Sequence, residues 1–320
     1  MPCYKPITGY RSRFVNDSGK RSIVFSPTKG YVDQKLDLPC GRCRGCRLDY
    51  SRQWAIRCMH EAQMHEDNSF ITLTYNDEHL PKDKSLHKED LQKFFKRLRK
   101  RGIKFKYYAC GEYGDENFRP HMHIIIFGYS FPDKTPWKID KGNILYRSKF
   151  LEEVWTAGYS LIGDCTFETC AYVARYVMKK RKGEPDERDP ITGKTNEEYY
   201  LRADEETGEM FRVLPEFCIM SRGSGKKTDP TLWRYGIGRA WYEQFKGDTE
   251  KDYITINYQK VGLPKYYDQV LAQEDELELM RRKKKRRYAL KQRADDNTPE
   301  RLDQRERVAE AKLKFKTRDL

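Results

Sequence analysis

The clearest pattern in the chain is a series of short apolar segments between residues 67 and 180, separated by charged or turn-forming residues. FITLTY alternates apolar and polar side chains and is rich in β-branched and aromatic residues, so it predicts a strand from Ser69 to Tyr75. KEDLQKFFKRLRKRG carries apolar residues at helical spacing and predicts a helix that ends at Gly102. The segments that follow predict two strands, a helix ending at Gly158, a fourth strand and a last helix: KFKYYACGE, HMHIIIFG, SKFLEEVWTAG, YSLIGD and ETCAYVARYVMKK.

This order of elements predicts an α+β fold. The arrangement is a split β-α-β-β-α-β core of ferredoxin-like or RRM-like type, an antiparallel sheet with helices on one face, followed by an added helix. The rest of the chain divides by composition into parts that flank this core. We expect a basic segment with a cysteine cluster at 1–66, the core at 67–180, an acidic loop or hairpin insertion at 181–215, an aromatic and glycine-containing part at 216–273, and a charged tail at 274–320, either a solvated helix or a partly disordered arm.

Charge then points to the kind of partner. The chain has 320 residues, of which 35% are charged and 38% hydrophobic, and its net charge of +14 favours a nucleic-acid partner. The tail from Arg281 to Leu320 holds 16 Lys and Arg against 7 Asp and Glu. Because basic runs are usually solvated, RRKKKRR predicts only non-specific, strongly salt-dependent DNA affinity.

The first residues and the cysteine count bear on the compartment. MPCYKPITGYRSR has no apolar core of the length that a signal peptide needs, and no run is long enough to span a bilayer. We therefore expect a protein of a reducing cytosol, with no membrane partner. Nine cysteines, an odd number, are then expected to be thiols or metal ligands rather than a disulfide framework.

Two histidines begin one of the predicted strands, in RPHMHIIIFG. On a strand, His121 and His123 point to the same face, so they can offer two imidazoles to one ligand, although strand histidines are also often simple hydrogen-bonded residues. Two imidazoles hold a hard cation poorly, which predicts a third, carboxylate ligand. Of Glu112, Asp115 and Glu116 we prefer Glu112, because it ends the preceding antiparallel strand while the other two lie in the connecting turn.

The last predicted helix carries a second constellation. Tyr172 and Tyr176 lie four residues apart and share a face, with Lys179 and Lys180 on either side of them. The opposite arc is apolar and can pack against the domain: Cys170, Val173, Ala174, Val177 and Met178. A phenol has a pKa of about 10, which nearby ammonium groups lower, and a metal on a phosphate makes phosphorus more electrophilic. A covalent phosphotyrosine is therefore plausible chemistry, with an ordinary aromatic pair as the alternative.

A cysteine cluster forms a separate hypothesis. Cys40, Cys43 and Cys46 have C-x₂-C-x₂-C spacing, which predicts three ligands of a zinc site. We take Cys58 as the fourth ligand, with His60 and the distant Cys3 as alternatives. Unliganded thiols and an iron–sulfur site are the competing interpretations.

Arginines near these motifs are candidates for DNA contact. Arg42, Arg44 and Arg47 surround the cysteines, and Arg175 lies between the two tyrosines. An ordinary solvated face is the simpler interpretation of such arginines.

Three motifs together resemble those of the HUH endonucleases, which start rolling-circle replication. FITLTY is similar to their first motif, HMH followed by Ile124 to their His-hydrophobe-His-hydrophobe motif, and YVARYVMKK to their two-tyrosine motif, in the family order. Within this superfamily the chain most resembles the replication initiation proteins of small single-stranded DNA phages, the microviruses, particularly the gokushovirus group. That likeness covers roughly residues 1–270 through MPCYKPI, PCGRCRGCR, GEYG, GIGRAWY and PKYY.

The resemblance implies a site-specific nickase and ligase with an HUH-type core. One tyrosine would attack single-stranded origin DNA and become linked to the 5′ phosphate, and the second would act after a round of replication, when the ends are rejoined. His121, His123 and Glu112 would hold Mg²⁺ or Mn²⁺, Lys179 or Lys180 would neutralise charge, and Tyr176 is the expected first nucleophile.

The same resemblance implies a place of action and partners. They are the bacterial host cytoplasm, a host helicase and a DNA polymerase. Two other functions stay open: a non-catalytic, zinc-containing nucleic-acid-binding protein, and an HUH transposase or plasmid initiator.

Overall fold

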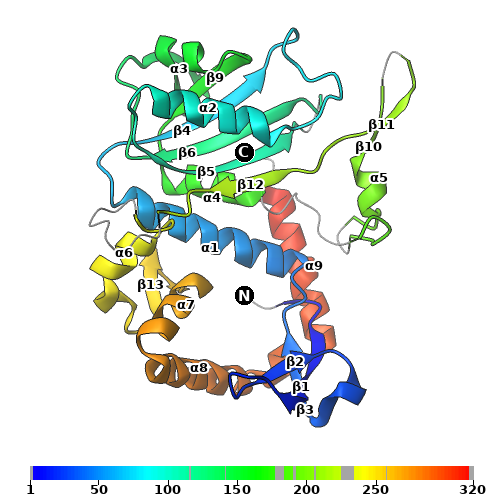
Figure 1. Cartoon of the computed structure of the whole chain (residues 1–320). Helices are drawn as coiled ribbons and strands as arrows, with labels where there is room; N and C mark the ends of the chain where they lie inside the picture. The colour runs from blue at the N-terminus through cyan, green and yellow to red at the C-terminus, as the bar shows by residue number, and fades with distance from the viewer. Residues whose placement is uncertain are drawn as a thin grey trace. The chain divides into compact units, whose positions relative to one another are not determined.

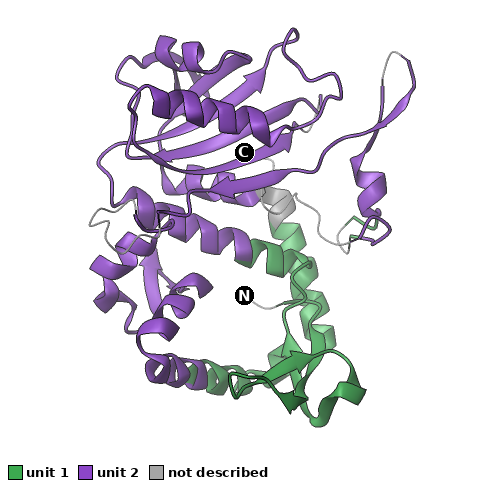
Figure 2. Cartoon of the chain, viewed as in Figure 1, with its two compact units in different colours: residues 1–49, 189–193, 285–320 green, residues 50–188, 194–284 purple. Residues whose placement is uncertain are grey.

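The computed structural model describes residues 3–114, 117–140, 142–176, 184–189, 192–204, 207–224, 234–256 and 258–316. The chain forms two compact units, coloured in Figure 2. Unit 1 comprises residues 1–49, 189–193 and 285–320, and unit 2 comprises residues 50–188 and 194–284. Several residues singled out in the sequence lie outside the described part: Asp115, Glu116, Val177, Met178, Lys179 and Lys180.

A seven-stranded sheet forms the centre of unit 2, with the strand order β12-β5-β6-β4-β9-β8-β7. All neighbouring strands are antiparallel (Figure 1), so the predicted α+β fold is confirmed. The sheet is wider than predicted, because β12, β7 and β8 extend it at its two edges. The bounds are β4 Asn68–Tyr75, β5 Lys106–Tyr113, β6 Pro120–Phe127, β7 Thr135–Asp140, β8 Asn143–Arg147, β9 Gly158–Gly163 and β12 Phe217–Met220.

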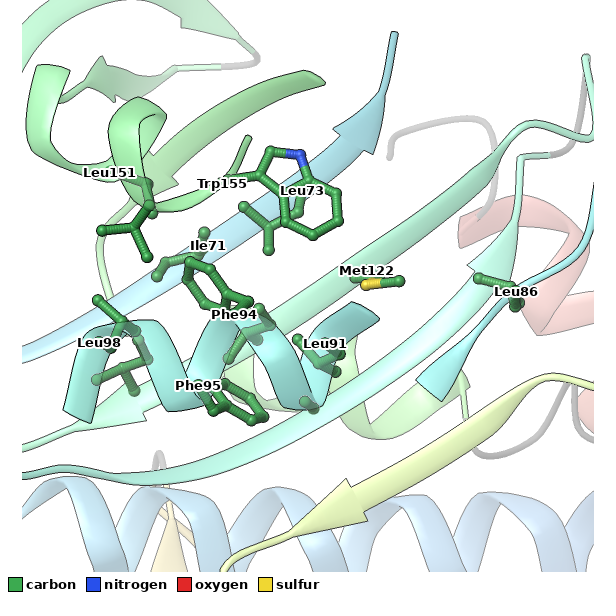
Figure 3. Close-up of a cluster of buried hydrophobic side chains, with 14 of the residues drawn as sticks. Ile71, Leu73, Leu86, Leu91, Phe94, Phe95, Leu98, Met122, Leu151 and Trp155 are labelled. Carbon is green, nitrogen blue, oxygen red and sulfur yellow. The ribbon is translucent and has the colours of Figure 1, made fainter. Parts of the chain in front are cut away.

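One face of this sheet packs against α2 (Lys88–Lys100) and α3 (Lys149–Val154). Strict alternation in β4 sends Ile71 and Leu73 to this face, where their partners in β6 are Ile124 and Met122. The buried stripe of α2 packs on them (Figure 3): Leu91, Phe94, Phe95 and Leu98. Each such buried side chain contributes about 1.5–3 kcal/mol.

The opposite face packs against α4 (Phe167–Tyr176) and part of α1 (Arg44–Ala62). Cys170, Val173 and Ala174 of α4 are buried there, as the predicted apolar arc requires. From α1, Trp54 and Cys58 join the same cluster, together with Tyr108, Cys110, Ile125 and Phe127 of the sheet.

His121 and His123 belong to this same face of the sheet, because they alternate along β6 with Met122 and Ile124.

The predicted end of α3 was wrong. The helix ends at Val154 with Trp155 as its C-cap, whereas Gly158 begins β9 and pairs with Tyr75. Gly158 has φ +150°, and a Cβ there would lie 2.3 Å from the backbone nitrogen of Asn76. The glycine is therefore needed for the close approach of two strands and not for stopping a helix.

The remaining elements of unit 2 follow the sheet core in the chain. The acidic insertion contains a short helix and a hairpin, the hairpin being one of its two predicted forms. The described part after β12 contains another hairpin and the helices α6 and α7, whose Trp241 and Tyr267 pack in one cluster with Ile56 of α1. The bounds are α5 Asn196–Tyr200, β10 Leu201–Ala203, β11 Met210–Arg212, α6 Arg239–Gln244, η3 Lys246–Thr249, β13 Tyr253–Ile256, β14 Gln259–Gly262 and α7 Lys265–Glu274.

Unit 1 contains a three-stranded antiparallel sheet of order β2-β1-β3, which the sequence did not predict. The charged tail is helical in its described part, as one of its predicted forms. The bounds are β1 Ile7–Val15, β2 Arg21–Val24, η1 Pro27–Lys29, β3 Gly30–Leu38, α8 Glu276–Lys291, η4 Ala294–Asn297 and α9 Pro299–Lys316. Two of the boundaries between the units fall inside α1 and α8. In the described ranges, each helix is too short or too polar to cross a membrane.

Candidate active site and thiol cluster

The two histidines of β6 present parallel rings on one face of the sheet. Their ring centroids are 6.4 Å apart and the ring planes differ by 5°. His123 pairs across the strands with Thr72 of β4 and Cys110 of β5, while His121 pairs with Thr74 and Glu112. The register therefore brings a carboxylate from β5 and a hydroxyl from β4 to the same patch of the sheet.

Glu112 and Thr72 hold the ring of His123 from two sides. Nε2 of His123 lies 2.9 Å from Oε1 of Glu112, and Nδ1 lies 3.1 Å from Oγ1 of Thr72. A carboxylate oxygen accepts, so Nε2 donates to Glu112, and Nδ1 then accepts from the Thr72 hydroxyl. His123 and Glu112 are each only 5% exposed, which keeps this hydrogen bond away from bulk water.

His121 is held in the tautomer that a metal ligand needs. Its Nδ1 donates to the carbonyl of Arg119 at 2.6 Å, which leaves Nε2 with a free lone pair. Burial lowers the pKa of His121, so the imidazole is neutral at pH 7. The side chain of Arg119 is itself anchored, because it donates to the carbonyl of Tyr75 at 2.9 Å and to Asp77 at 2.7 Å.

Tyr172 of α4 lies against these histidines. Its ring is nearly perpendicular to the ring of His123, at a centroid distance of 5.3 Å, and to that of Phe70, at 6.0 Å. Tyr172 is 36% exposed. Burial of Cys170, Val173 and Ala174 against the sheet fixes the rotation of α4 about its axis, and with it the face on which Tyr172 lies.

The other predicted residues of this helix are described less fully. Tyr176 is the last described residue of α4, but its side chain lies outside the described part, as do Lys179 and Lys180. Arg175 is half-buried. The structure thus brings His121, His123, Glu112 and Tyr172 together.

Thr72 and Arg119 contribute to this site and were missed in the sequence. Both act by orienting an imidazole through its Nδ1 atom. The alternation of FITLTY places Thr72 on one face of a strand, but the register that pairs it with His123 cannot be read from the sequence.

The cysteine cluster of unit 1 gathers four thiols. The Sγ atoms of Cys3, Cys40, Cys43 and Cys46 all lie within 4.8 Å of one another, a group that could hold a metal ion such as zinc. The structure brings Cys3 to this group, but it does not bring Cys58 or His60 there. Cys58 is fully buried in the apolar cluster with Trp54 and Tyr108, so the choice of Cys58 as the fourth ligand is replaced by Cys3.

The imidazole of His60 is held by two aromatic side chains of unit 2. Its ring stacks on Trp241 at a centroid distance of 3.5 Å, and Nδ1 lies 2.7 Å from the hydroxyl of Tyr267. Burial lowers the pKa of His60 to about 3.

The arginines near the thiols are partly engaged in ion pairs. Arg44 pairs with Glu310 at 3.1 Å, and Arg47 pairs with the buried carboxylate of Asp189. Arg42 donates its backbone amide to Sγ of Cys40 at 3.5 Å. The side chains of Arg44 and Arg47 therefore take part in the structure of unit 1.

Comparison with known proteins adds to this picture. Residues 68–181 match the family model described as replication-associated protein ORF2/G2P. Replication-associated protein VP4 of Bdellovibrio phage phiMH2K is 39% identical over 193 residues, which are 56% of this chain and 58% of that protein. Replication-associated protein ORF2 of Spiroplasma virus 4 is 34% identical over 197 residues, or 56% of this chain and 61% of the relative.

A third relative, replication-associated protein ORF4 of Chlamydia phage 1, is 37% identical over 153 residues, covering 45% of this chain and 38% of that protein. The chain thus spans less than two thirds of the length of these relatives. No solved structure matches it. The matched range 68–181 contains the histidine pair, Glu112 and both tyrosines, and the predicted resemblance to phage replication-associated proteins is confirmed.

Proposed function

We propose that this protein initiates rolling-circle replication of a small single-stranded DNA phage by nicking and rejoining origin DNA. The observation that carries the proposal is the contact of Tyr172 with His123, whose imidazole is hydrogen-bonded to Glu112. A nucleophile and a set of metal-binding side chains meet on one sheet face. The names of the three phage relatives support the same role in replication.

The fold is consistent with an HUH-type core at residues 67–180. Within the larger sheet, the strands β4, β5, β6 and β9 have the spatial order β5-β6-β4-β9. Along the chain, α2 lies between β4 and β5, and α3 lies between β6 and β9. This is the order of a split β-α-β-β-α-β unit. The histidines lie on β6, one of its two central strands, and α4 is the helix added after the unit.

His121, His123 and Glu112 are the proposed ligands of Mg²⁺ or Mn²⁺. The donor set fits, because Nε2 of His121 has its lone pair available and Glu112 supplies an oxygen donor beside it. Two imidazoles and a carboxylate suit Mn²⁺, whereas Mg²⁺ prefers oxygen ligands and would keep several waters. At His123, metal binding would replace the hydrogen bond to Glu112. The chemistry that a bound divalent cation supplies here is polarisation of a phosphate oxygen.

The tyrosines carry the covalent steps. A tyrosine hydroxyl gives up its proton, and its oxygen attacks the phosphorus of the scissile phosphodiester. The bond from phosphorus to the 3′ oxygen breaks, that oxygen takes up a proton, and the 5′ phosphate stays on the tyrosine. Attack of a 3′ hydroxyl on the phosphotyrosine reverses these steps and joins two ends. Tyr172 and Tyr176 would divide the two cleavages, with Lys179 or Lys180 favouring the phenolate.

The remaining parts of the proposal follow from these products. The free 3′ hydroxyl is a primer for a DNA polymerase, and a host helicase would separate the strands. Both enzymes place the reaction in the cytoplasm of a bacterial host. Arg42, Arg44, Arg47 and Arg175 remain candidates for contact with DNA.

A denaturing gel of full-length protein with labelled single-stranded DNA from its own genome tests the proposal. We expect an Mn²⁺-dependent covalent adduct that EDTA prevents, that Tyr172→Phe and Tyr176→Phe reduce to different extents, and that the double variant lacks. Tyr258→Phe is the control, because this fully exposed tyrosine lies between β13 and β14. DNA that covers the whole genome and is bound but never cleaved would instead favour the non-catalytic binding protein.

A further inference from the structure

We infer that Cys3, Cys40, Cys43 and Cys46 bind one structural Zn²⁺ ion that closes the small sheet of unit 1. The inference is independent of the proposed nicking chemistry. It rests on the arrangement of the sulfur atoms, on the amides that surround them, and on the weak packing of the segment between the first two ligands.

The spacing of the thiols matches a single tetrahedral ion. All four Sγ atoms lie within 4.8 Å of one another, and the separation between Cys3 and Cys43 is 3.8 Å. A tetrahedral zinc ion with Zn–S bonds of about 2.3 Å places its sulfur ligands about 3.8 Å apart. A disulfide needs about 2.05 Å between the sulfurs, and all four cysteines are free thiols. An iron–sulfur cluster holds its cysteines farther apart, because several iron and sulfide atoms lie between them.

Backbone amides point at three of the sulfur atoms, and each amide stabilises negative charge on the sulfur that it faces. The amide of Cys40 lies 3.2 Å from Sγ of Cys3, and the amide of Cys43 lies 3.2 Å from Sγ of Cys40. The amide of Tyr4 donates to Sγ of Cys43 at 3.4 Å. Donors of this kind stabilise the negative charge that a metal-bound sulfur keeps, so they act as the outer shell of a metal site.

The ligands bracket the sheet in the chain. Cys3 comes four residues before β1 begins at Ile7, and Cys40 comes two residues after β3 ends at Leu38. The residues of β1, β2 and β3 are all described, and the only fully buried ones are Gly9, Ser12 and Gly30. A sheet that buries no large apolar side chain gains little from the hydrophobic effect and needs a cross-link to persist. A metal that joins Cys3 to the turn before α1 provides that link.

Metal analysis of the full-length protein tests this assignment. We expect one zinc per chain in wild type, and an intense thiolate-to-cobalt absorption with tetrahedral d–d bands after expression in cobalt-supplemented medium. Cys3→Ser and Cys43→Ser should each lose most of the metal. Cys165→Ser and Cys218→Ser should keep it, because these half-exposed thiols lie outside the group.

Limited proteolysis of the same samples reports the structural role. Zinc removal with a mercurial and a chelator should open residues 5–39 to the protease, while fragments of unit 2 stay resistant. Mn²⁺-dependent cleavage of DNA is measured in a separate assay. Wild-type protein without stoichiometric zinc, stoichiometric iron in its place, or equal metal loss in Cys165→Ser and Cys43→Ser would each overturn the inference. Failure of DNA cleavage with zinc still bound would count against the proposed function alone.

Discussion

His123 and Glu112 lie on neighbouring strands with 2.9 Å between Nε2 and Oε1, although they are 11 positions apart in the chain. The turn between β5 and β6 sets this register, in which Glu112 faces His121 directly and His123 diagonally. Glu112 already orients the imidazole of His123. With a small movement, its carboxylate can share one cation with the imidazoles of His121 and His123. The sheet itself thus largely preorganises the donor set that we propose.

Loss of the Thr72 hydroxyl should weaken the metal site without removing a ligand. In Thr72→Val, Nδ1 of His123 loses its partner at 3.1 Å, so no hydroxyl is left to accept from Nδ1–H when Nε2 binds a cation. We expect the Mn²⁺ concentration for half-maximal DNA cleavage to rise about 10-fold or more, as is typical for outer-shell partners of metal ligands. Single-turnover cleavage across a Mn²⁺ titration measures this shift.

Thr74→Val is the matched control for Thr72. Thr74 lies on the same strand and face, but it pairs with His121, and in the described part of the chain it does not hydrogen-bond His123. Its Mn²⁺ requirement should stay close to that of wild type. Equal shifts in both variants would indicate a general disturbance of β4, and no shift in Thr72→Val would show that this hydroxyl does not orient a ligand.

The ion pair of Lys106 and Glu61 should be among the most sensitive positions of unit 2. Lys106 Nζ donates to Oε1 of Glu61 at 2.7 Å, and the carboxylate also accepts from the amide of Gly238 at 2.7 Å. Glu61 is fully buried, so Lys106→Met leaves a buried charge without its counterion. We expect a loss of about 3–5 kcal/mol in the free energy of unfolding.

Urea denaturation followed by circular dichroism measures this loss. Lys93→Met is the control, since Lys93 pairs with Asp90 at 3.1 Å on the exposed side of α2 and should contribute less than about 1 kcal/mol. If Lys106→Met were no more harmful than Lys93→Met, the buried pair would not stabilise the unit.

Glu61 should also make stability depend on pH. Burial acts to raise its pKa, but hydrogen bonds from His65, Lys106 and Gly238 outweigh it, and the folded-state pKa is lowered. The stabilisation is thus fully present above the unfolded pKa of about 4.5 and is lost as pH falls through the lower folded value. We expect Glu61→Gln to be less stable than wild type at pH 7, with the difference shrinking at acid pH. A constant difference from pH 7 to pH 3 would contradict this assignment.

The sequence predicted those elements whose apolar residues meet one core. β4 and α2 each have apolar residues on one side, as Ile71 and Leu91 illustrate, and β6 has a continuous apolar run that is buried on both faces of the sheet. The strands of unit 1 bury no large apolar side chain, so their sequence lacks such a pattern and the sheet was missed. Gly158 was misread because a glycine after a helical stretch resembles a stop signal, whereas the real constraint is its approach to Asn76.

The candidate site was accessible from sequence only in part. Spacing placed His121 and His123 on one face, because alternation in a strand is a local property. The position of Thr72 beside His123 depends on strand register. The position of Cys3 beside Cys40 depends on the return of the chain over 37 positions. Neither is a local property of the sequence. Cys58 appeared a better ligand than Cys3 because it is closer in sequence, yet its helix turns it into an apolar core.

The lysines of α8 should act on DNA through charge alone. Lys283, Lys284 and Lys285 are exposed, and they belong to the most basic stretch of the chain. Each phosphate neutralised on single-stranded DNA adds about 0.7 to the slope of log affinity against log salt, so changing all three to Gln should reduce that slope by up to about 2. Gln has a helix propensity similar to that of Lys, which keeps α8 intact. Fluorescence anisotropy with a labelled oligonucleotide at several salt concentrations measures the slope.

The same three positions changed to Arg provide the control, because charge is retained while the side chains differ. This variant should keep the wild-type slope, and both variants should cleave at the wild-type single-turnover rate once DNA is saturating. An unchanged slope in the Gln variant would mean that these lysines do not reach the phosphates. Loss of cleavage at saturating DNA would instead assign α8 a part in the reaction, which its charge alone does not explain.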